Sequence, residues 1–486
     1  MDRYYRTKEF KSLLKSYESA CKQGRPAILD PSEYADLANY YLQTGSSAHA
    51  MEVINQALSV YPHSEEALLI KARAMLRSQL SPRKALAIAQ RVSDKTSSDY
   101  LFFCAEVELF CKHVDEANML LEGIYQDMLY GRNSSSDADD DFDEEDDEDD
   151  GDEVLEKINC HCLDSAFLFV DYEEFDMANI WLKRCRADNS DDYLELKASV
   201  MLGKGNYAGA EQLLQKLIDR DPFSDDWWVM LADCQLKADK VDDSIESCGY
   251  ALALNPANDK AVLYYGNTLG AKGKYLDALK QYKLYTQHNP ADDTGYYMQG
   301  VTYLCLNKMD EAARYLHKAE GIKSPHNPNH HEVLVKLVLL YELVGDVQKA
   351  IRYLEQVEQA DDEPDEEVLM LKINVLLSMG NTAEAARCFK QVEEITDDMP
   401  ETFFNMAYAY YSHQFYKEAY HVFKSLFSIV DDNWNTGYSY YAKCCEQLHK
   451  TDEYQKARLL AQLVNPEEYD VVFGSIKQDN QSNQQQ

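Results

Sequence analysis

The chain has 486 residues, which is too long for a single compact core and predicts either several domains or a solenoid. Its 48 Lys and Arg residues are outnumbered by 85 Asp and Glu residues. The formal net charge of −37 argues against nucleic acid and anionic membrane surfaces as partners. The N-terminus is charged throughout and no run of about 18 apolar residues occurs, so we expect a soluble, cytoplasmic protein without a membrane span.

A leading helix is predicted within residues 1–30. Phe10, Leu13, Leu14 and Tyr17 recur at helical spacing and would form one apolar stripe. Glycine and proline residues then close the segment before residue 31. A helix in this place would cover the exposed end of the array that follows.

The rest of the chain carries an internal repeat that is clearest between residues 191 and 292. One set of prolines and two sets of small residues recur there every 34 residues: Pro222, Pro256 and Pro290; Ala198, Ala232 and Gly266; and Ala210, Ser244 and Ala278. A period of this length is typical of a repeat array. Each copy has two apolar stripes at helical spacing with a polar break between them. The pattern therefore predicts pairs of short helices that bury their apolar faces against neighbouring pairs.

This pattern resembles the tetratricopeptide repeat family. The copy at 31–64 matches all eight characteristic positions of that family: Tyr34, Leu37, Ala38, Tyr41, Ala50, Ile54, Ala57 and Pro62. About twelve copies can be traced. The resemblance implies an all-α, right-handed superhelical solenoid of helix-turn-helix repeats. It also implies a concave groove, lined by the first helix of each repeat, in which protein partners bind.

One acidic segment interrupts the predicted array. Repeats one to three are expected at 31–130 and repeats four to twelve at 158–470, whereas residues 131–157 break the pattern. From Asp137 to Glu153, 14 of 17 residues are acidic and none is Lys or Arg. Such a run repels itself and has little apolar surface to bury, so 131–157 is predicted to be a disordered insertion. Residues 471–486 are predicted to be a disordered, Gln-rich tail.

No sequence pattern indicates an enzyme. The chain lacks the glycine-rich nucleotide motifs, the H-E-x-x-H motif of metalloproteases and the G-x-S-x-G nucleophile elbow. We therefore predict no catalytic residue, no cofactor and no metal. An EF-hand beginning at Asp146 is excluded, because Lys157 stands where that loop requires a bidentate glutamate.

Two histidine-containing groups leave a metal site open as an alternative. A helix start is the simpler interpretation of the first group, and a long solvated turn is the simpler interpretation of the second. The groups are Cys160-His161-Cys162 and the set of His326, His330 and His331.

The twelve cysteines are predicted to be reduced. Cys185, Cys248, Cys444 and Cys445 fall at repeat positions that the family fills with small or apolar core residues. A free thiol suits such a position as a small hydrophobe, and reduced thiols suit a cytoplasmic chain.

Partner-binding candidates follow from the resemblance, which assigns the second, fifth and ninth positions of a repeat to the groove. Aromatic, Met and aliphatic side chains there suit peptide recognition, because they bury area at modest entropic cost. The candidates are Lys260, Leu263, Asn267, Tyr297, Val301, Met370, Asn374, Phe404 and Tyr408.

Some members of the family bind the acidic tail of a chaperone through a carboxylate clamp of two asparagines and three basic residues. Asn374 and Asn405 match the asparagines, and Lys443 matches the arginine position. Met370 and Ser439 replace the two lysines, and lysine lacks the bidentate fork of arginine. A co-chaperone or assembly adaptor with a degenerate clamp is therefore the alternative function.

The main prediction is a non-enzymatic interaction scaffold that binds a protein or peptide partner in the groove. The acidic loop would attract a basic partner, or would compete with the partner for a basic stretch of the groove. The sequence predicts neither the identity of the partner nor the oligomeric state.

Overall fold

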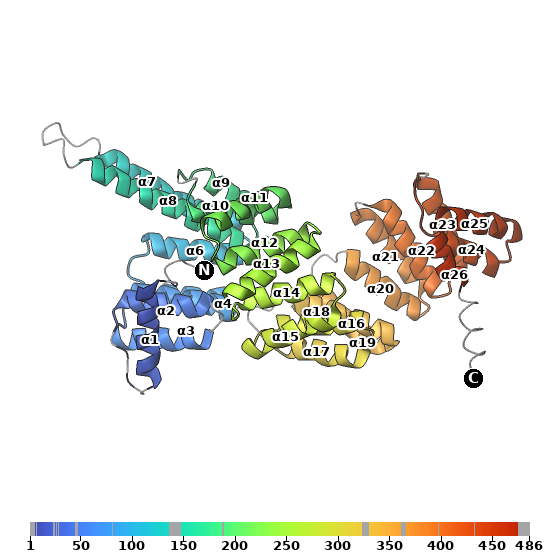
Figure 1. Ribbon diagram of the computed structural model, residues 1–486, viewed down its shortest axis with the longest axis horizontal. Helices are drawn as coiled ribbons and strands as arrows, with labels where there is room; N and C mark the ends of the chain where they lie inside the picture. The colour runs from blue at the N-terminus through green and yellow to red at the C-terminus, as the bar shows by residue number, and fades with distance from the viewer. Residues whose placement is uncertain are drawn as a thin grey trace. The chain divides into compact units, whose positions relative to one another are not determined.

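The structure is a computed structural model, which describes residues 5–474 except 6, 23–24, 26, 28, 44–46, 80, 136–146, 187–188, 323–329, 361–365, 397 and 432. Over this described part the chain forms 26 α-helices and no β-strand (Figure 1). The prediction of an all-α chain is confirmed.

The helices are a leading helix, twelve antiparallel hairpins and a final helix, counted over the same residues. The leading helix α1 spans Lys8–Lys22 and the final helix α26 spans Pro466–Phe473. The hairpins pair consecutive helices: α2 (Pro31–Gln43) with α3 (Ser47–Val60), α4 (Glu65–Gln79) with α5 (Pro82–Ala89), α6 (Ser98–Phe110) with α7 (Val114–Ser135), α8 (Asp147–Asp171) with α9 (Phe175–Leu182), α10 (Asp191–Gly203) with α11 (Tyr207–Arg220), α12 (Asp225–Lys237) with α13 (Val241–Leu254), α14 (Asp259–Ala271) with α15 (Tyr275–His288), α16 (Thr294–Cys305) with α17 (Met309–Gly321), α18 (His330–Val344) with α19 (Val347–Ala360), α20 (Glu366–Ser378) with α21 (Thr382–Ile395), α22 (Met399–Ser412) with α23 (Tyr416–Ile429), and α24 (Tyr438–Gln447) with α25 (Thr451–Val464).

The chain divides into two compact units. The first comprises Met1–Gly295 with Ile322–Asn327, and the second comprises Tyr296–Gly321 with Pro328–Gln486. Inside each unit the second helix of one hairpin packs against the first helix of the next, as α11 does on α12 and α23 does on α24. This stacking is the arrangement of a solenoid. The predicted hand of the superhelix stays a prediction.

Small residues let the two helices of a hairpin approach closely, as the repeat pattern predicts. A Cβ atom added to Gly266 of α14 would lie 2.6 Å from Cε1 of Tyr282 on α15. Two repeat positions are thus matched in size, because the Tyr282 ring fills the space that Gly266 leaves and is 1% exposed. Gly300 and Leu316 repeat the arrangement in the second unit, where an added Cβ would lie 2.7 Å from the leucine.

The turn inside each hairpin has a fixed register. In ten hairpins of the described chain, a residue with positive φ follows a fully buried residue of the first helix by seven positions, as Gly273 (φ 75°) follows Gly266. The next N–H group then closes a Schellman turn, as Lys274 does by donating to the Leu269 carbonyl at 2.8 Å. Four of these positive-φ residues are glycine, and the other six are Lys112, Glu173, Asp239, Asn307, Gln414 and His449.

Polar side chains tie neighbouring hairpins together at the starts of the first helices. In the first unit, Asp225 accepts hydrogen bonds from the side-chain amides of Asn255 and Asn258, both at 2.8 Å. One repeat later, Asp259 accepts from the amide of Asn289 at 2.8 Å. The residue that ends a second helix therefore holds the first helix of its own hairpin. Asn258, the N-cap of α14, ties the hairpin of α12 and α13 to the next one.

Helices extend into two segments that the sequence analysis predicts to be disordered. Of the predicted insertion at 131–157, helix α7 covers residues 131–135 and helix α8 covers residues 147–157. An ion pair between Lys157 and Glu153, one turn apart at 2.7 Å, supports the second and third turns of α8. Residues 136–146 lie outside the described residues. At the other end α26 runs to Phe473, past the predicted start of the tail at 471, because it packs on α24 and α25.

Candidate protein-binding surface

The predicted partner-binding residues fall in both units. Lys260, Leu263 and Asn267 lie on α14 in the first unit. The others lie on first helices of the second unit: Tyr297 and Val301 on α16, Met370 and Asn374 on α20, Phe404, Asn405 and Tyr408 on α22, and Lys443 on α24.

The three predicted residues on α14 differ in exposure and in hydrogen bonding. Lys260 is exposed, whereas Leu263 and Asn267 are half-buried. The Asn267 side-chain oxygen accepts a hydrogen bond from the Tyr282 hydroxyl at 2.9 Å. Asn267 is therefore engaged in its own hairpin, and only Lys260 presents a freely accessible polar group there.

Four rings gather on two neighbouring first helices of the second unit. We call them the aromatic cluster: Phe404, Tyr408 and Tyr411 of α22, and Tyr440 of α24. The Tyr440 centroid lies 5.1 Å from that of Tyr408 and 5.2 Å from that of Tyr411, both edge-on, and Phe404 stacks on Tyr408 at 6.1 Å. These are favourable aromatic geometries. Tyr408 is 43% exposed and the other three are half-buried, so the cluster is anchored in the fold and open on one side.

Two members of the cluster were not among the predicted residues. Tyr411 and Tyr440 were missed, because neither occupies one of the three groove positions in the predicted register. Burial raises the pKa of Tyr411 to about 12, and burial together with Tyr408 and Glu468 raises the pKa of Tyr440. Both hydroxyls therefore stay protonated at neutral pH and the rings keep uncharged faces.

The last four first helices of the second unit carry no unpaired lysine or arginine. Their three lysines all form ion pairs: Lys336 with Glu367 at 2.7 Å, Lys372 with Glu358 at 2.5 Å, and Lys443 with Glu446 at 2.9 Å. The same helices (α18, α20, α22 and α24) also contain Glu332, Glu342, Glu366 and Glu401. The surface therefore has surplus negative charge.

Glu342 is the most enclosed of these surplus carboxylates. Its side chain is 19% exposed, and burial raises its pKa. Among the described residues its one ion-pair partner is the Nε2 atom of His413, at 4.0 Å. Burial lowers the pKa of His413, so at neutral pH this histidine is predominantly uncharged. Glu342 thus lies beside the C-terminal end of α22 without a compensating positive charge.

The structure corrects the register of the last repeat and removes the clamp position of Lys443. His449 has positive φ, and such a turn residue follows the buried small residue of the first helix by seven positions. That small residue is therefore Ala442 and not Cys445. Lys443 therefore sits three positions further along the repeat than predicted. Its Nζ atom also lies 4.6 Å from the ring centroid of Phe473 on α26. The predicted lysine is thus covered by the final helix and neutralised by Glu446.

The Cys160-His161-Cys162 group lies in the middle of α8, so the predicted helix start was wrong. Cys160 is exposed and Cys162 is buried, while Nε2 of the buried His161 lies 3.0 Å from the Leu121 carbonyl oxygen. Over the residues that the structure describes, no three His, Cys, Asp or Glu side chains are placed to hold a metal ion. His330 is exposed at the start of α18, and His326 lies outside the described residues.

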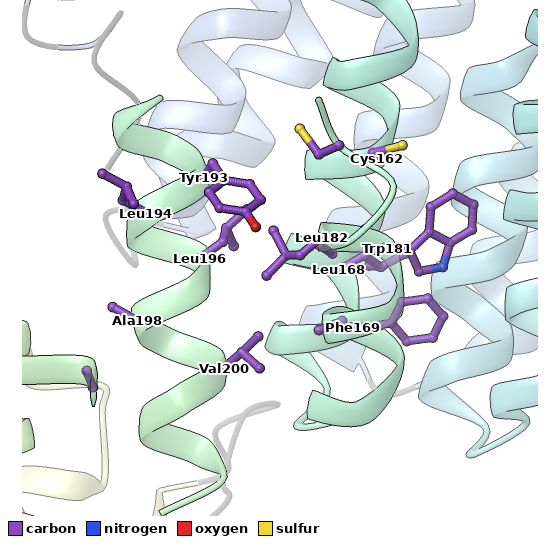
Figure 2. Packing of buried hydrophobic residues seen from close by; sticks show 14 of the residues in the cluster. Cys162, Leu168, Phe169, Trp181, Leu182, Tyr193, Leu194, Leu196, Ala198 and Val200 are labelled. Carbon is purple, nitrogen blue, oxygen red and sulfur yellow. The ribbon is translucent and has the colours of Figure 1, made fainter. Parts of the chain in front are cut away.

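The first unit has an aromatic cluster of its own, centred on Trp181 of α9, which is fully buried (Figure 2). Its ring meets Tyr125 of α7 at 5.8 Å and His161 of α8 at 5.4 Å, and its indole N–H donates to Asn118 at 3.0 Å. The Arg184 guanidinium lies 4.5 Å from the Trp181 centroid and 5.3 Å from that of Tyr125. Arg184 also forms an ion pair with Glu122.

All twelve cysteines are free, and the four predicted to be buried are buried. Burial raises the pKa of Cys248 and of Cys444 to about 12, so these thiols are protonated and serve as apolar packing groups. Within the described residues, no helix is long and apolar enough to cross a membrane.

Comparison with known proteins finds the same repeat. Models of the tetratricopeptide repeat match residues 31–74 and 201–248. Anaphase-promoting complex subunit 3 of Schizosaccharomyces pombe is 21% identical over 197 residues, which span 40% of this chain and only 29% of that relative.

Solved structures of similar proteins include two of helical repeat proteins. The Cut9–Hcn1 hetero-tetramer of the anaphase-promoting complex is 14% identical, with 94% of this chain and 90% of that chain covered and a TM-score of 0.45. A tetratricopeptide repeat protein of Parabacteroides merdae is 16% identical, covers 50% of this chain and 94% of its own, and has a TM-score of 0.40. The matched segments fall on α2 to α4 and on α10 to α13, so the chain contains tetratricopeptide repeats in these two places.

Proposed function

We propose that this protein is a non-enzymatic scaffold that binds a peptide or protein partner on the first-helix surface of its second unit. The observation that carries the proposal is the aromatic cluster, in which anchored rings leave Tyr408 43% exposed. Rigid aromatic side chains of this kind supply much of the binding energy in protein interfaces. Met370 and Asn374, half-buried on the neighbouring α20, extend the same surface.

The partner is basic in this proposal. The surplus carboxylates of α18, α20 and α22 favour it, and so does the net charge of −37. The acidic run from Asp137 to Glu153 would raise the rate of encounter with such a partner through its field, an effect that salt weakens. The acidic chaperone tail of the alternative function is disfavoured, because Lys443 is paired with Glu446 and covered by Phe473.

We place the protein in the cytoplasm. Twelve free cysteines are compatible with a reducing compartment, and none is needed to cross-link the fold.

Affinity capture with matched variants tests the proposal. Tyr408→Ala removes the most exposed ring of the cluster, and Tyr250→Ala removes a ring of similar exposure (48%) on α13 in the first unit. A discrete partner should be retained by the intact chain and by Tyr250→Ala but lost with Tyr408→Ala. Equal capture by both variants would move the binding surface away from the cluster.

The acidic run is tested separately by replacing residues 137–153 with a Gly-Ser sequence of the same length. The expected result is weaker capture at low salt and little change at moderate salt, because the replacement removes 14 negative charges. Unchanged capture at both salt concentrations would reduce the run to a solubilising spacer.

A further inference from the structure

The chain places a lysine or arginine over several of its rings but not over the aromatic cluster. Lys318 lies over Tyr296 at 4.1 Å and Lys450 lies over Tyr420 at 4.1 Å. Phe473 carries both Lys443 and Arg458. Within the described residues no lysine or arginine lies over Phe404, Tyr408, Tyr411 or Tyr440.

The charges around the cluster favour a cation and disfavour an anion. Every lysine of α18, α20, α22 and α24 is paired within the chain, so these four helices offer an anionic ligand no unpaired positive charge. Glu342 at the end of α22 is largely enclosed and lacks a charged partner at neutral pH. A bound cation near it would offset the cost of burying this carboxylate.

We propose that the aromatic cluster is the site at which an arginine side chain of the partner binds, and that Glu342, which lies against His413 at the C-terminal end of α22, adds to the negative field that attracts it. This rests on the proposed function and names the chemistry that its surface recognises. Arginine is favoured over lysine because a guanidinium is planar, weakly hydrated and able to stack on an aromatic face while donating hydrogen bonds from its edge.

Labelled peptides of defined chemistry test this with the full-length protein. The probes are three fluorescent peptides of Gly-Ser-X repeats, in which X is arginine, lysine or citrulline, the last being uncharged but shaped like arginine. Binding is followed by fluorescence anisotropy at about 0.15 M salt, where exposed charges further apart than about 8 Å are screened. We expect the arginine peptide to bind most tightly, the lysine peptide several-fold more weakly and the citrulline peptide not measurably. Equal affinities for arginine and lysine would overturn the proposal.

Variants then locate the binding. Tyr408→Ala should lower the affinity for the arginine peptide by about fivefold or more, in line with a cation–π contact. Tyr408→Phe should keep an affinity close to that of the parent. Tyr250→Ala is the matched control and should not change the affinity. Glu342→Gln should weaken the arginine peptide and leave the citrulline peptide unaffected. Circular dichroism of each variant shows whether its helices are retained.

The outcomes separate this inference from the proposed function. If the arginine peptide binds Tyr408→Ala as well as the parent, while capture of the cellular partner still depends on Tyr408, the arginine site is wrong and the scaffold function stands. If neither the peptide nor the captured partner depends on Tyr408, both proposals fail. Loss of peptide binding only when residues 137–153 are replaced would assign the peptide to the acidic run and also overturn the arginine site.

Discussion

Two aromatic clusters, one in each unit, differ in how the chain covers their rings. In the first unit, the Trp181 cluster is closed by the chain itself, because Arg184 lies over the rings of Trp181 and Tyr125 and pairs with Glu122. In the second unit, the aromatic cluster has comparable ring distances, but no lysine or arginine of the described residues covers it and Tyr408 remains 43% exposed. One fold therefore uses rings either to stabilise itself or to leave a surface available.

The position in the hairpin explains the difference. Trp181 belongs to a second helix and lies between α7 and α8, where neighbouring hairpins enclose it. The four rings of the aromatic cluster all lie on first helices, α22 and α24. Rings of the first kind should therefore determine stability, and rings of the second kind should determine binding.

Truncation of the two central rings should separate these roles most strongly. Trp181→Ala removes a fully buried side chain and its hydrogen bond to Asn118, so we expect a loss of about 3–5 kcal/mol of unfolding free energy. Tyr408→Ala should cost less than about 1 kcal/mol because the ring is partly in water. Chemical denaturation, with hydrogen exchange resolved by segment, measures both. Similar losses would contradict the division of roles.

Removal of the covering guanidinium should have an intermediate effect. Arg184→Ala loses the stacking on two rings and the ion pair with Glu122, and should cost about 1–2 kcal/mol, since the pair is partly exposed. Arg184→Lys should recover only part of this, because an ammonium group cannot stack as a plane. Full recovery by lysine would show that charge alone stabilises the first cluster.

The stability of the Trp181 cluster should also depend on pH. Burial lowers the pKa of His161 below its ordinary 6.5, although the Leu121 carbonyl and Glu122 oppose this. The unfolded chain gains a proton as the pH falls through about 6.5, whereas the folded chain gains it only at lower pH. Stability should therefore fall below that pH and level off under the folded pKa.

The variant His161→Gln isolates this term, because glutamine can still donate to the Leu121 carbonyl but does not titrate. The measured quantity is the difference in unfolding free energy between parent and variant at neutral and mildly acidic pH. A difference that does not change with pH would remove His161 from the account of stability.

Substitutions at the hairpin turns should give the smallest changes in unfolding free energy, and the changes should be equal in the two units. Both clusters lie on hairpins whose turn has a residue with positive φ. Glu173 closes the turn between α8 and α9, and Gln414 closes the turn between α22 and α23, both at positive φ. Replacing either with glycine should raise the unfolding free energy by about 0.5 kcal/mol, the balance between relieved strain and added backbone entropy.

The reverse exchange is the control for those turns. Gly273 has positive φ and nothing within 4 Å of an added Cβ, so Gly273→Ala should cost about 1 kcal/mol through backbone strain alone. Thermal unfolding detects these changes. A glycine that destabilises either turn would mean that the Glu173 or Gln414 side chain stabilises it through contacts.

The sequence alone predicts the hairpins well, because their packing depends on residue size at a fixed period. Gly266 and Tyr282 are an example, since a small residue opposite a large one is visible in the pattern and is needed in the structure. The four cysteines predicted to be buried were found for the same reason, even where the register assigned to Cys445 was wrong. Periodic apolar positions therefore carry most of the information on the fold.

The candidate surface is less predictable, because it depends on register and on contacts between repeats. The turn that sets the register is formed by Lys112, Glu173 or His449 as well as by glycine, so the last repeat was placed three residues out of register. Tyr440 was overlooked because it lies outside the three groove positions in either register. The pairing of Lys443 with Glu446 beneath Phe473 involves a helix, α26, that follows no repeat pattern. Phe404 and Tyr408 were predicted from position alone, and their role in binding stays a prediction.

The shared turn also bears on how such a chain can change in length. The seven-residue spacing between buried residue and left-handed turn recurs in ten hairpins of the described chain with varied side chains. A genetic duplication or deletion of one whole repeat, wherever its ends fall, rejoins half a hairpin to an equivalent half and restores an intact turn. Because each hairpin contacts mainly its neighbours, lineages can gain or lose repeats singly without passing through an unfolded ancestor.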